Sequence, residues 1–157
     1  MRFAHEYPRL VMPDAARLIA AICIGALAYV VSLQIKPLMP ESTAFGSFAY
    51  INAILGIVCG WTVMGKRAGR GVVAAINNGL SSALVLVIWG LLLHASYQMF
   101  DRAMDNWYNG FFTAMAAIFQ FMAEYALVMV DPLVLFSLMA GGIIAGLATE
   151  YAWRTWR

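Results

Sequence analysis

Hydrophobic residues fall into five long runs along the chain, and charged residues, prolines and glycines separate these runs. A helix needs about 20 apolar residues to cross the hydrocarbon core of a bilayer, so each run is long enough for a crossing. The stretches after the first and second runs, KPLMPES and GKRAGRG, are rich in residues that end helices. The pattern predicts an all-α integral membrane protein. The runs cover about 15–35, 45–64, 72–99, 110–130 and 132–153.

The fourth run differs from the others because its polar residues form a stripe. Thr113, Gln120, Glu124 and Asp131 are spaced so that they fall on one face of a helix. Such a stripe is typical of an amphipathic helix that lies in the membrane interface, or is re-entrant. It is also typical of a crossing helix that turns its polar side to the bundle. Hydrophobicity alone does not decide between these interpretations.

The boundary between the fourth and last runs has the pattern of a helix start. Asp131 can accept hydrogen bonds from free backbone N–H groups as an N-cap residue. Pro132 suits the first turn of the helix that follows. We therefore predict a sharp turn between these two segments.

The distribution of the ten lysines and arginines favours four crossings over five. If 110–130 lies on the outer face, eight of these cations are on one side of the membrane and only Lys36 and Arg102 are on the other. If 110–130 crosses, Arg154 and Arg157 change sides and the distribution becomes six against four. The positive-inside rule then predicts four transmembrane helices, an amphipathic outer-face segment before the last span, and cytoplasmic N- and C-termini. Five spans remain the alternative.

Composition supports a single helical membrane domain surrounded by lipid. Of the 157 residues, 63% are hydrophobic and 11% charged, and the mean hydropathy is +0.77. We place the domain at 12–157 and interpret 1–11 as an N-terminal extension.

The net charge of +2, without a basic run that contains aromatic residues, argues against nucleic-acid binding. Cys23 and Cys59 lie inside apolar runs, which does not favour a disulfide or a zinc site.

Small residues recur every four positions on the second and last runs. Lipid provides no hydrophobic drive for helix association, so such residues let helices approach closely. We interpret them mainly as packing residues within the chain, with contact to a partner as the alternative. They are Asn52, Gly56 and Gly60 on the second run and Gly141, Gly142, Ala145 and Gly146 on the last.

One face of the third run carries the strongest group of polar side chains, formed by His94, Gln98, Asp101 and Asp105. Imidazole and carboxylates so placed can bind a divalent metal or relay a proton. The simpler interpretation is a helix end that leaves the membrane and becomes polar. We favour that interpretation and predict no metal site, because a single histidine without further ligand spacing is weak evidence.

A second polar group lies around the connection between the second and third runs. Lys66, Arg67 and Arg70, together with Asn77 and Asn78, could hold an anion with backbone N–H groups at the helix start. Basic loops also arise from membrane topology alone, and we favour that explanation for the cations. The asparagines then serve interhelical hydrogen bonds.

The chain contains no nucleophile–base set, phosphate loop or cofactor fingerprint. We therefore expect neither catalytic residues nor a cofactor, and we predict that the protein is not an enzyme.

A family resemblance is carried by four stretches, which together cover most of the chain from Met12 onward. They are MPDAARLIAA, KPLMPESTAFGSFAYINAILGIVCGWTVMGKRAGRG, NNGL and DPLVLFSLMAGGIIAGLATEYAWRTWR. Together they resemble the TrgA family of small alphaproteobacterial membrane proteins, which is named for an association with tellurite resistance. The resemblance implies a bacterial inner-membrane protein linked to oxyanion stress. It implies no mechanism, and Lys66, Arg67 and Arg70 are the candidate positions in the shared run.

Two other functions fit the same residues. One is an accessory subunit of a larger photosynthetic or respiratory membrane complex, which would explain the small-residue faces and the many aromatic residues. The other is a small transporter or channel, which would require self-association because four spans offer little room for a pathway.

Overall fold

The computed structural model describes residues 13–39, 46–104 and 110–156. Within these ranges all the regular elements are helical, which confirms the predicted all-α class. The proposed extension 1–11 lies outside the described residues. In chain order the elements are α1 (Pro13–Ile35), the 3₁₀ turn η1 (Lys36–Leu38), α2 (Phe48–Cys59), the π turn η2 (Gly60–Met64), the 3₁₀ turn η3 (Gly65–Arg67), α3 (Val72–Met104), α4 (Phe111–Val128) and α5 (Pro132–Thr155).

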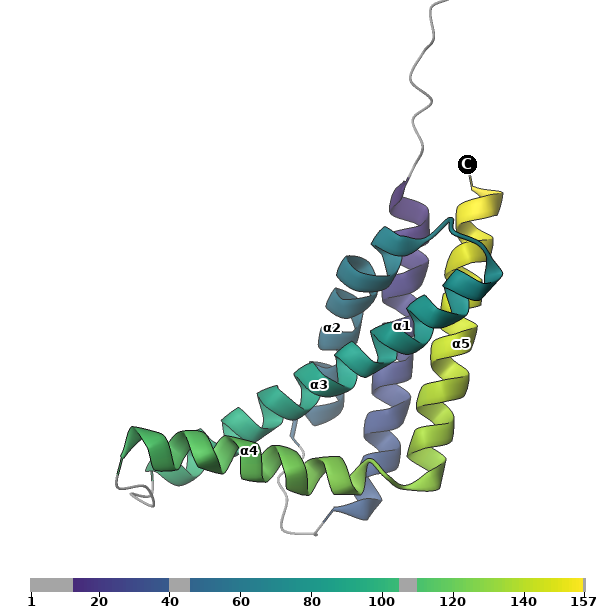
Figure 1. Ribbon diagram of the computed structural model, residues 1–157. Helices are drawn as coiled ribbons and strands as arrows, with labels where there is room; N and C mark the ends of the chain where they lie inside the picture. Colours follow the sequence, from purple (N-terminus) through teal and green to yellow (C-terminus); the bar gives the residue numbers. More distant parts are fainter. Residues whose placement is uncertain (1–12, 40–45, 105–109, 157) are drawn as a thin grey trace, which may run out of the picture.

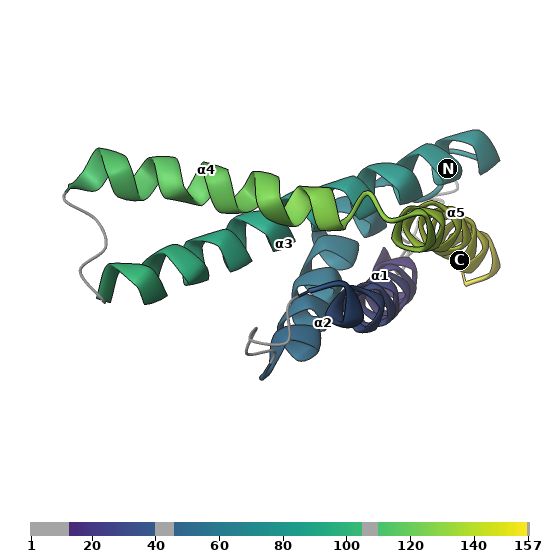
Figure 2. The same ribbon diagram turned by 90° about the horizontal axis from the view of Figure 1, so that it is seen from below.

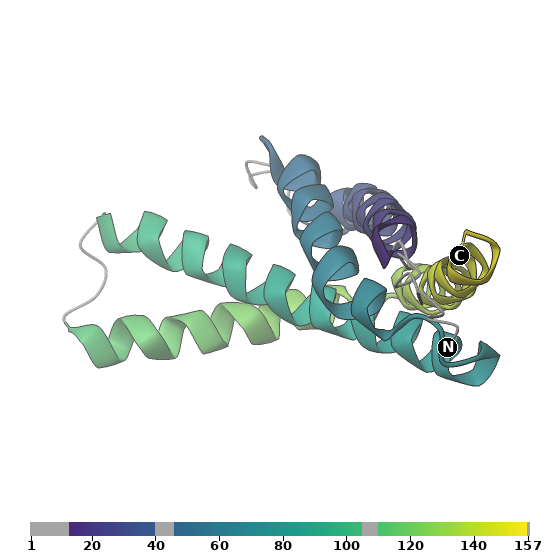
Figure 3. The ribbon, with the colours of Figure 1, turned by 90° about the horizontal axis from the view of Figure 1, so that it is seen from above.

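Three helices have roughly parallel axes, and the other two extend away from them (Figure 1). Helices α1, α2 and α5 form the upright part of the molecule, α3 leans across it, and α4 lies across the lower end. Views along the perpendicular direction show α3 and α4 side by side as an arm that projects from the other three helices (Figures 2 and 3). We call the second half of α3 together with α4 the arm.

The start of α1, the connection from η3 to α3 and the end of α5 lie at one end of the molecule (Figure 1). We call this the basic end, because these segments carry Arg17, Lys66, Arg67, Arg70 and Arg154. The element η1, the start of α2 and the whole of α4 lie at the opposite end.

Glycines set the close approach of α2 to α1. A Cβ atom on Gly56 would lie 2.7 Å from the carbonyl oxygen of Ile24, and a Cβ atom on Gly60 would collide with the carbonyl oxygen of Ala20. These two glycines are one helical turn apart, so they form a continuous smooth strip from α2 to the start of η2. The two helices therefore pack with their backbones in contact.

Glycines also allow close packing of α3 against α5 near the basic end. A Cβ atom on Gly79 would collide with the carbonyl oxygen of Gly142, and one on Gly146 would collide with that of Ala75. Gly141 instead faces α1, where its added Cβ would collide with Leu27. Ala145 is buried in the main core. The small residues of α5 thus serve contacts with two different helices.

The arm has a small core of its own. Ala95 and Met99 of α3 are buried against Ala117 and Phe121 of α4. Helix α3 has 33 residues, which gives it a length of about 50 Å. It is much longer than the roughly 30 Å hydrocarbon core of a bilayer, so α3 must tilt strongly or extend beyond that core.

The connection from α4 to α5 confirms the predicted helix start at Asp131. Its carboxylate oxygen Oδ1 accepts hydrogen bonds from the backbone N–H groups of Leu133 at 2.9 Å and Val134 at 3.4 Å. Pro132 occupies the first turn of α5. The chain therefore turns sharply between the two helices.

Five helical segments of the described chain are long and apolar enough to cross a membrane, and α4 is one of them. The prediction of four crossings is therefore not confirmed by length and composition. The protein is described by these criteria as a multi-pass helical membrane protein.

Candidate functional site

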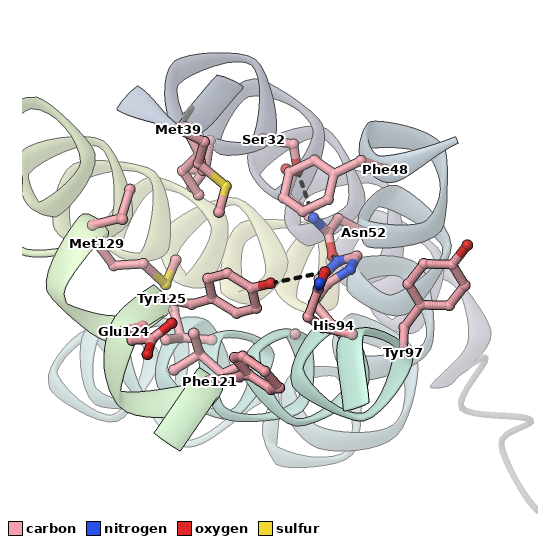
Figure 4. Close-up of a pocket in the computed structure, with 18 of the residues that line it drawn as sticks. Ser32, Met39, Phe48, Asn52, His94, Tyr97, Phe121, Glu124, Tyr125 and Met129 are labelled. Carbon is pink, nitrogen blue, oxygen red and sulfur yellow. Dashed lines mark hydrogen bonds between the residues drawn. The ribbon is translucent and has the colours of Figure 1, made fainter. Parts of the chain in front are cut away.

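A cavity of about 630 Å³ lies where α1, α2, α3 and α4 meet, at the end opposite the basic end (Figure 4). Its walls combine aliphatic side chains, aromatic rings and a few polar groups. The polar and aromatic members of the lining are Ser32, Phe48, Asn52, His94, Tyr97, Gln98, Asp101, Arg102, Phe121, Glu124 and Tyr125.

Three helices contribute a chain of hydrogen bonds to one wall of this cavity. Ser32 Oγ donates to the backbone carbonyl oxygen of Ala28 at 2.7 Å, and Asn52 Nδ2 donates to Ser32 Oγ at 2.9 Å. Asn52 Oδ1 then lies 2.9 Å from His94 Nε2. Ser32 and Asn52 are both buried, so their polar atoms depend on these contacts.

The direction of this hydrogen-bond chain fixes the tautomer of His94. The carbonyl oxygen of Ala28 can only accept, so Ser32 gives its proton there and accepts from the amide nitrogen of Asn52. Asn52 Oδ1 therefore faces His94, and Nε2 of His94 must carry the donated proton. In the neutral imidazole, Nδ1 is left as an acceptor.

Packing of α2 on α1 explains why Asn52 reaches Ser32. Gly56 lies one turn after Asn52 and touches the backbone at Ile24 and the side chain of Ala28. Because the helices run in opposite directions, one turn back along α2 corresponds to one turn forward along α1, which places Asn52 opposite Ser32. The glycine contact therefore sets the register of the hydrogen-bond chain.

Aromatic rings form much of the remaining wall. The ring of Phe48 packs against His94 with a centroid separation of 4.4 Å. The guanidinium carbon of Arg102 lies 4.5 Å from the ring centroid of Phe121. Tyr125 Oη donates to Gln98 Oε1 over 3.5 Å, which is a long and weak hydrogen bond.

The structure brings three of the four residues of the predicted polar face into this cavity. His94, Gln98 and Asp101 all line it, whereas Asp105 lies outside the described residues. Among the described residues, no group of three or more histidine, cysteine or acidic side chains could hold a metal ion. The groups that the sequence did not connect to His94 are Asn52 and Ser32.

The basic connection between α2 and α3 already holds an anionic group of the chain itself. Glu150 of α5 accepts hydrogen bonds from Gly69 N at 2.7 Å and from Gly71 N at 3.1 Å. Arg154 Nε lies 3.1 Å from the same carboxylate. Gly69 and Gly71 have φ of +89° and +98°, a left-handed conformation that aims their N–H groups at Glu150 and that favours glycine.

The five residues of the predicted anion site lie in η3, in the connection that follows it and in the second turn of α3. Lys66, Arg67, Arg70 and Asn77 are exposed to the surroundings. Asn78 Nδ2 donates to the backbone carbonyl oxygen of Arg67 at 3.0 Å, which ties α3 to the end of η3. An external anion would therefore meet exposed side chains, while the Gly69 and Gly71 donors are engaged by Glu150.

Comparisons with known proteins gave no match to a family model, to a curated protein or to a solved structure.

Proposed function

We propose that this chain is a multi-pass protein of the bacterial inner membrane, with four crossings and with α4 on the outer face. The crossings are α1, the continuous segment from α2 to η3, α3 and α5. The support for this arrangement comes from the faces of α4 and from the position of the charges.

Helix α4 presents three kinds of surface. Its buried face, with Ala117 and Phe121, packs on α3. A second face exposes large apolar side chains such as Phe112 and Phe119. The polar stripe forms a third, exposed face, where Gln120 Nε2 donates to Glu124 Oε1 at 3.1 Å. An exposed amide and an exposed carboxylate are costly in hydrocarbon. A helix that lies in the membrane interface has lipid on one side and water on the other, so its polar face stays hydrated.

The charges agree with the same orientation. Lys66, Arg67, Arg70 and Arg154 gather at the basic end, and the direction of the chain places Lys36 at the opposite end. Cytoplasmic sides of membrane proteins carry an excess of lysine and arginine. The basic end and both termini are therefore assigned to the cytoplasm.

Cysteine labelling tests this topology. In a variant with Cys23 and Cys59 replaced by alanine, a single cysteine introduced by Gln120→Cys is expected to react with a membrane-impermeant maleimide in intact spheroplasts. A cysteine introduced by Lys66→Cys is expected to react only after lysis. Labelling is measured by the mass shift of the purified protein. If α4 crosses the bilayer, the Gln120→Cys variant stays unlabelled both before and after lysis.

We infer that the protein acts in oxyanion stress, tellurite included, as a ligand-binding protein rather than as an enzyme. The link to oxyanion stress comes from the family resemblance. The observation that carries the ligand-binding part is the cavity, because its wall holds a hydrogen-bond chain that ends at His94. Such a chain also supports the packing of α1, α2 and α3, but its last member, His94, lines a hollow of about 630 Å³, as the polar groups of ligand sites do.

A complementation experiment tests this function. In a strain that lacks the gene, the wild-type chain is expected to restore growth on tellurite, and His94→Gln is expected to restore it less. Glutamine can still donate to Asn52 Oδ1, but it replaces the rigid ring acceptor Nδ1 by an amide oxygen at the end of a flexible side chain. Tyr50→Phe is the matched control, because Tyr50 is 65% exposed and does not line the cavity. Equal growth of the His94→Gln and wild-type strains at equal abundance would remove the cavity from the function.

The basic connection between α2 and α3 is the alternative location of the functional site, and the same complementation experiment tests it. The combined change of Lys66, Arg67 and Arg70 to glutamine is expected to leave resistance intact wherever the topology is intact, because Glu150 already engages the loop N–H groups. Lost resistance at unchanged topology and abundance would instead move the site to these cations.

The arm favours a second function, as an accessory subunit of a larger membrane complex. It exposes several large apolar side chains, among them Tyr97, Phe100, Met104 and Phe112. The arm projects away from α1, α2 and α5 (Figure 2), so these side chains lie where another membrane protein can contact them. Extraction in mild detergent followed by a native gel and mass spectrometry of the band decides the question. A band that contains only this chain excludes the subunit function.

A further inference from the structure

The free nitrogen of His94 indicates what kind of group a ligand must present. Nε2 donates to Asn52 Oδ1, and within the described residues Nδ1 has no hydrogen-bond partner. In the neutral imidazole Nδ1 is an acceptor, so a ligand at this position satisfies it with a hydroxyl or another donor. A ligand that offers only carbonyl oxygens cannot do so.

The rest of the wall indicates the shape of the ligand. Phe48, Phe121 and Tyr125 bring aromatic rings from α2 and α4 to the same hollow as His94 (Figure 4). Aromatic rings interact favourably with one another in offset or edge-to-face arrangements, beyond the area that they bury. Aliphatic side chains such as Val31 and Leu86 line the cavity as well. The wall therefore suits a flat ring that carries an apolar substituent.

The charged residues lie where the cavity meets the surface. Asp101, Arg102 and Glu124 are exposed and line it, so charge is confined to the rim. With α4 on the outer face, this rim is at the boundary between headgroups and hydrocarbon. Molecules with a polar ring and an apolar tail concentrate at that boundary. Entry from the lipid phase thus fits the distribution of polar groups.

We propose that the cavity binds a membrane-soluble aromatic alcohol of the quinol class, with one ring hydroxyl donating to Nδ1 of His94. The ring packs between the aromatic walls from α2 and α4, and the apolar tail follows the aliphatic lining. This inference rests on the proposed ligand-binding function and names its ligand class. It concerns binding only and includes no electron transfer by the chain.

The weak contact between Tyr125 and Gln98 gives the ligand a second polar partner. Their oxygen atoms are 3.5 Å apart, so little is lost when either one turns to a ligand hydroxyl. Gln98 follows His94 by one helical turn and therefore lies on the same face of α3. A ring with two hydroxyl groups can use both positions.

Binding to protein in phosphatidylcholine nanodiscs tests the proposal. Three probes share a decyl chain: decylubiquinol kept reduced under argon, decylubiquinone, and decanol. The amount of each probe retained beyond that in empty nanodiscs is measured at equilibrium. We expect saturable binding of decylubiquinol and at least about tenfold weaker binding of decylubiquinone. The reason is that the carbonyl oxygen of the quinone and Nδ1 of His94 are both hydrogen-bond acceptors. Decanol is expected to bind more weakly than decylubiquinol because it lacks the ring.

Two variants connect the binding to the geometry. His94→Gln keeps the donor to Asn52 and is expected to fold, but it loses the preference for the reduced probe. Tyr50→Phe is expected to bind all three probes as the wild type does. Equal affinity for quinol and quinone, or for quinol and decanol, overturns the proposed ligand class. So does an unchanged preference in His94→Gln.

Failure of this proposal is distinguishable from failure of the proposed function. If no probe binds above the empty nanodiscs but His94→Gln still impairs growth on tellurite, the quinol class is wrong and the cavity keeps its functional role. If the probes bind as expected but His94→Gln grows like the wild type on tellurite, the ligand class holds and the link to oxyanion stress is wrong.

Discussion

Replacement of Gly79 by valine is expected to separate α3 from α5 and to lower the free energy of unfolding by about 3 kcal/mol. A Cβ atom on Gly79 would collide with the carbonyl oxygen of Gly142, and the neighbouring contact of Gly146 with Ala75 is equally close. Both obstacles are backbone atoms, which cannot rotate away as a side chain does. The helices must therefore move apart over at least two turns. Unfolding in mixed micelles, followed by circular dichroism, measures the effect.

Gly90→Ala is the matched control on the same helix. The nearest atom to a Cβ at Gly90 is Asn52 Oδ1 at 3.8 Å, which is an ordinary van der Waals distance. We expect this change to alter the free energy of unfolding by less than about 0.5 kcal/mol. If Gly79→Val is as stable as Gly90→Ala, α3 and α5 do not touch through their backbones, and the assignment of Gly142 and Gly146 to this contact is wrong.

The positions of the helices could be predicted from the sequence because each helix coincides with an apolar run. The first run, predicted at 15–35, corresponds to α1 at Pro13–Ile35. The third run was predicted to end at 99, whereas α3 continues to Met104. Hydrophobicity marks the part of a helix that suits lipid and not the polar turns that follow it. Residues 100–104, which follow the predicted end of the run, form the end of α3 in the arm.

The environment of the fourth run could not be predicted, because a helical pattern shows which residues share a face but not what that face meets. Gln120 and Glu124 share a face, as predicted, and that face is exposed. Glu124 of this face also lines the cavity that α4 forms with α1, α2 and α3. Only the packing of Phe121 on α3 places the remaining faces.

The candidate site could be predicted along α3 and not between helices. His94, Gln98 and Asp101 lie on one face because of their spacing, and they do line one cavity. The contacts of His94 with Asn52, and of Asn52 with Ser32, depend on the register between helices. That register is set by backbone contacts at glycines, and the spacing of residues within one helix carries no information about it.

Glu150→Ala is expected to release the connection between α2 and α3 from α5, at a cost of about 3 kcal/mol in the free energy of unfolding. Glu150 is 5% exposed and accepts from Gly69 N and Gly71 N. Without the carboxylate, both N–H groups lose their acceptor. The left-handed conformation of the two glycines is then no longer stabilised by these hydrogen bonds. Unfolding in mixed micelles measures the loss of stability. Hydrogen exchange at the two amides measures the loss of the contact itself.

Arg154→Gln separates the two parts of the Glu150 interaction. It removes the ion pair of 3.1 Å but leaves both backbone hydrogen bonds, and the Arg154 side chain is 53% exposed. Water screens such a pair, so we expect a cost below about 1 kcal/mol and unchanged exchange at Gly69 and Gly71. Equal effects of Arg154→Gln and Glu150→Ala would show that the ion pair holds the connection. The expected inequality instead shows that the N–H groups of Gly69 and Gly71, bonded to an internal carboxylate, hold the connection, while Lys66, Arg67 and Arg70 stay exposed.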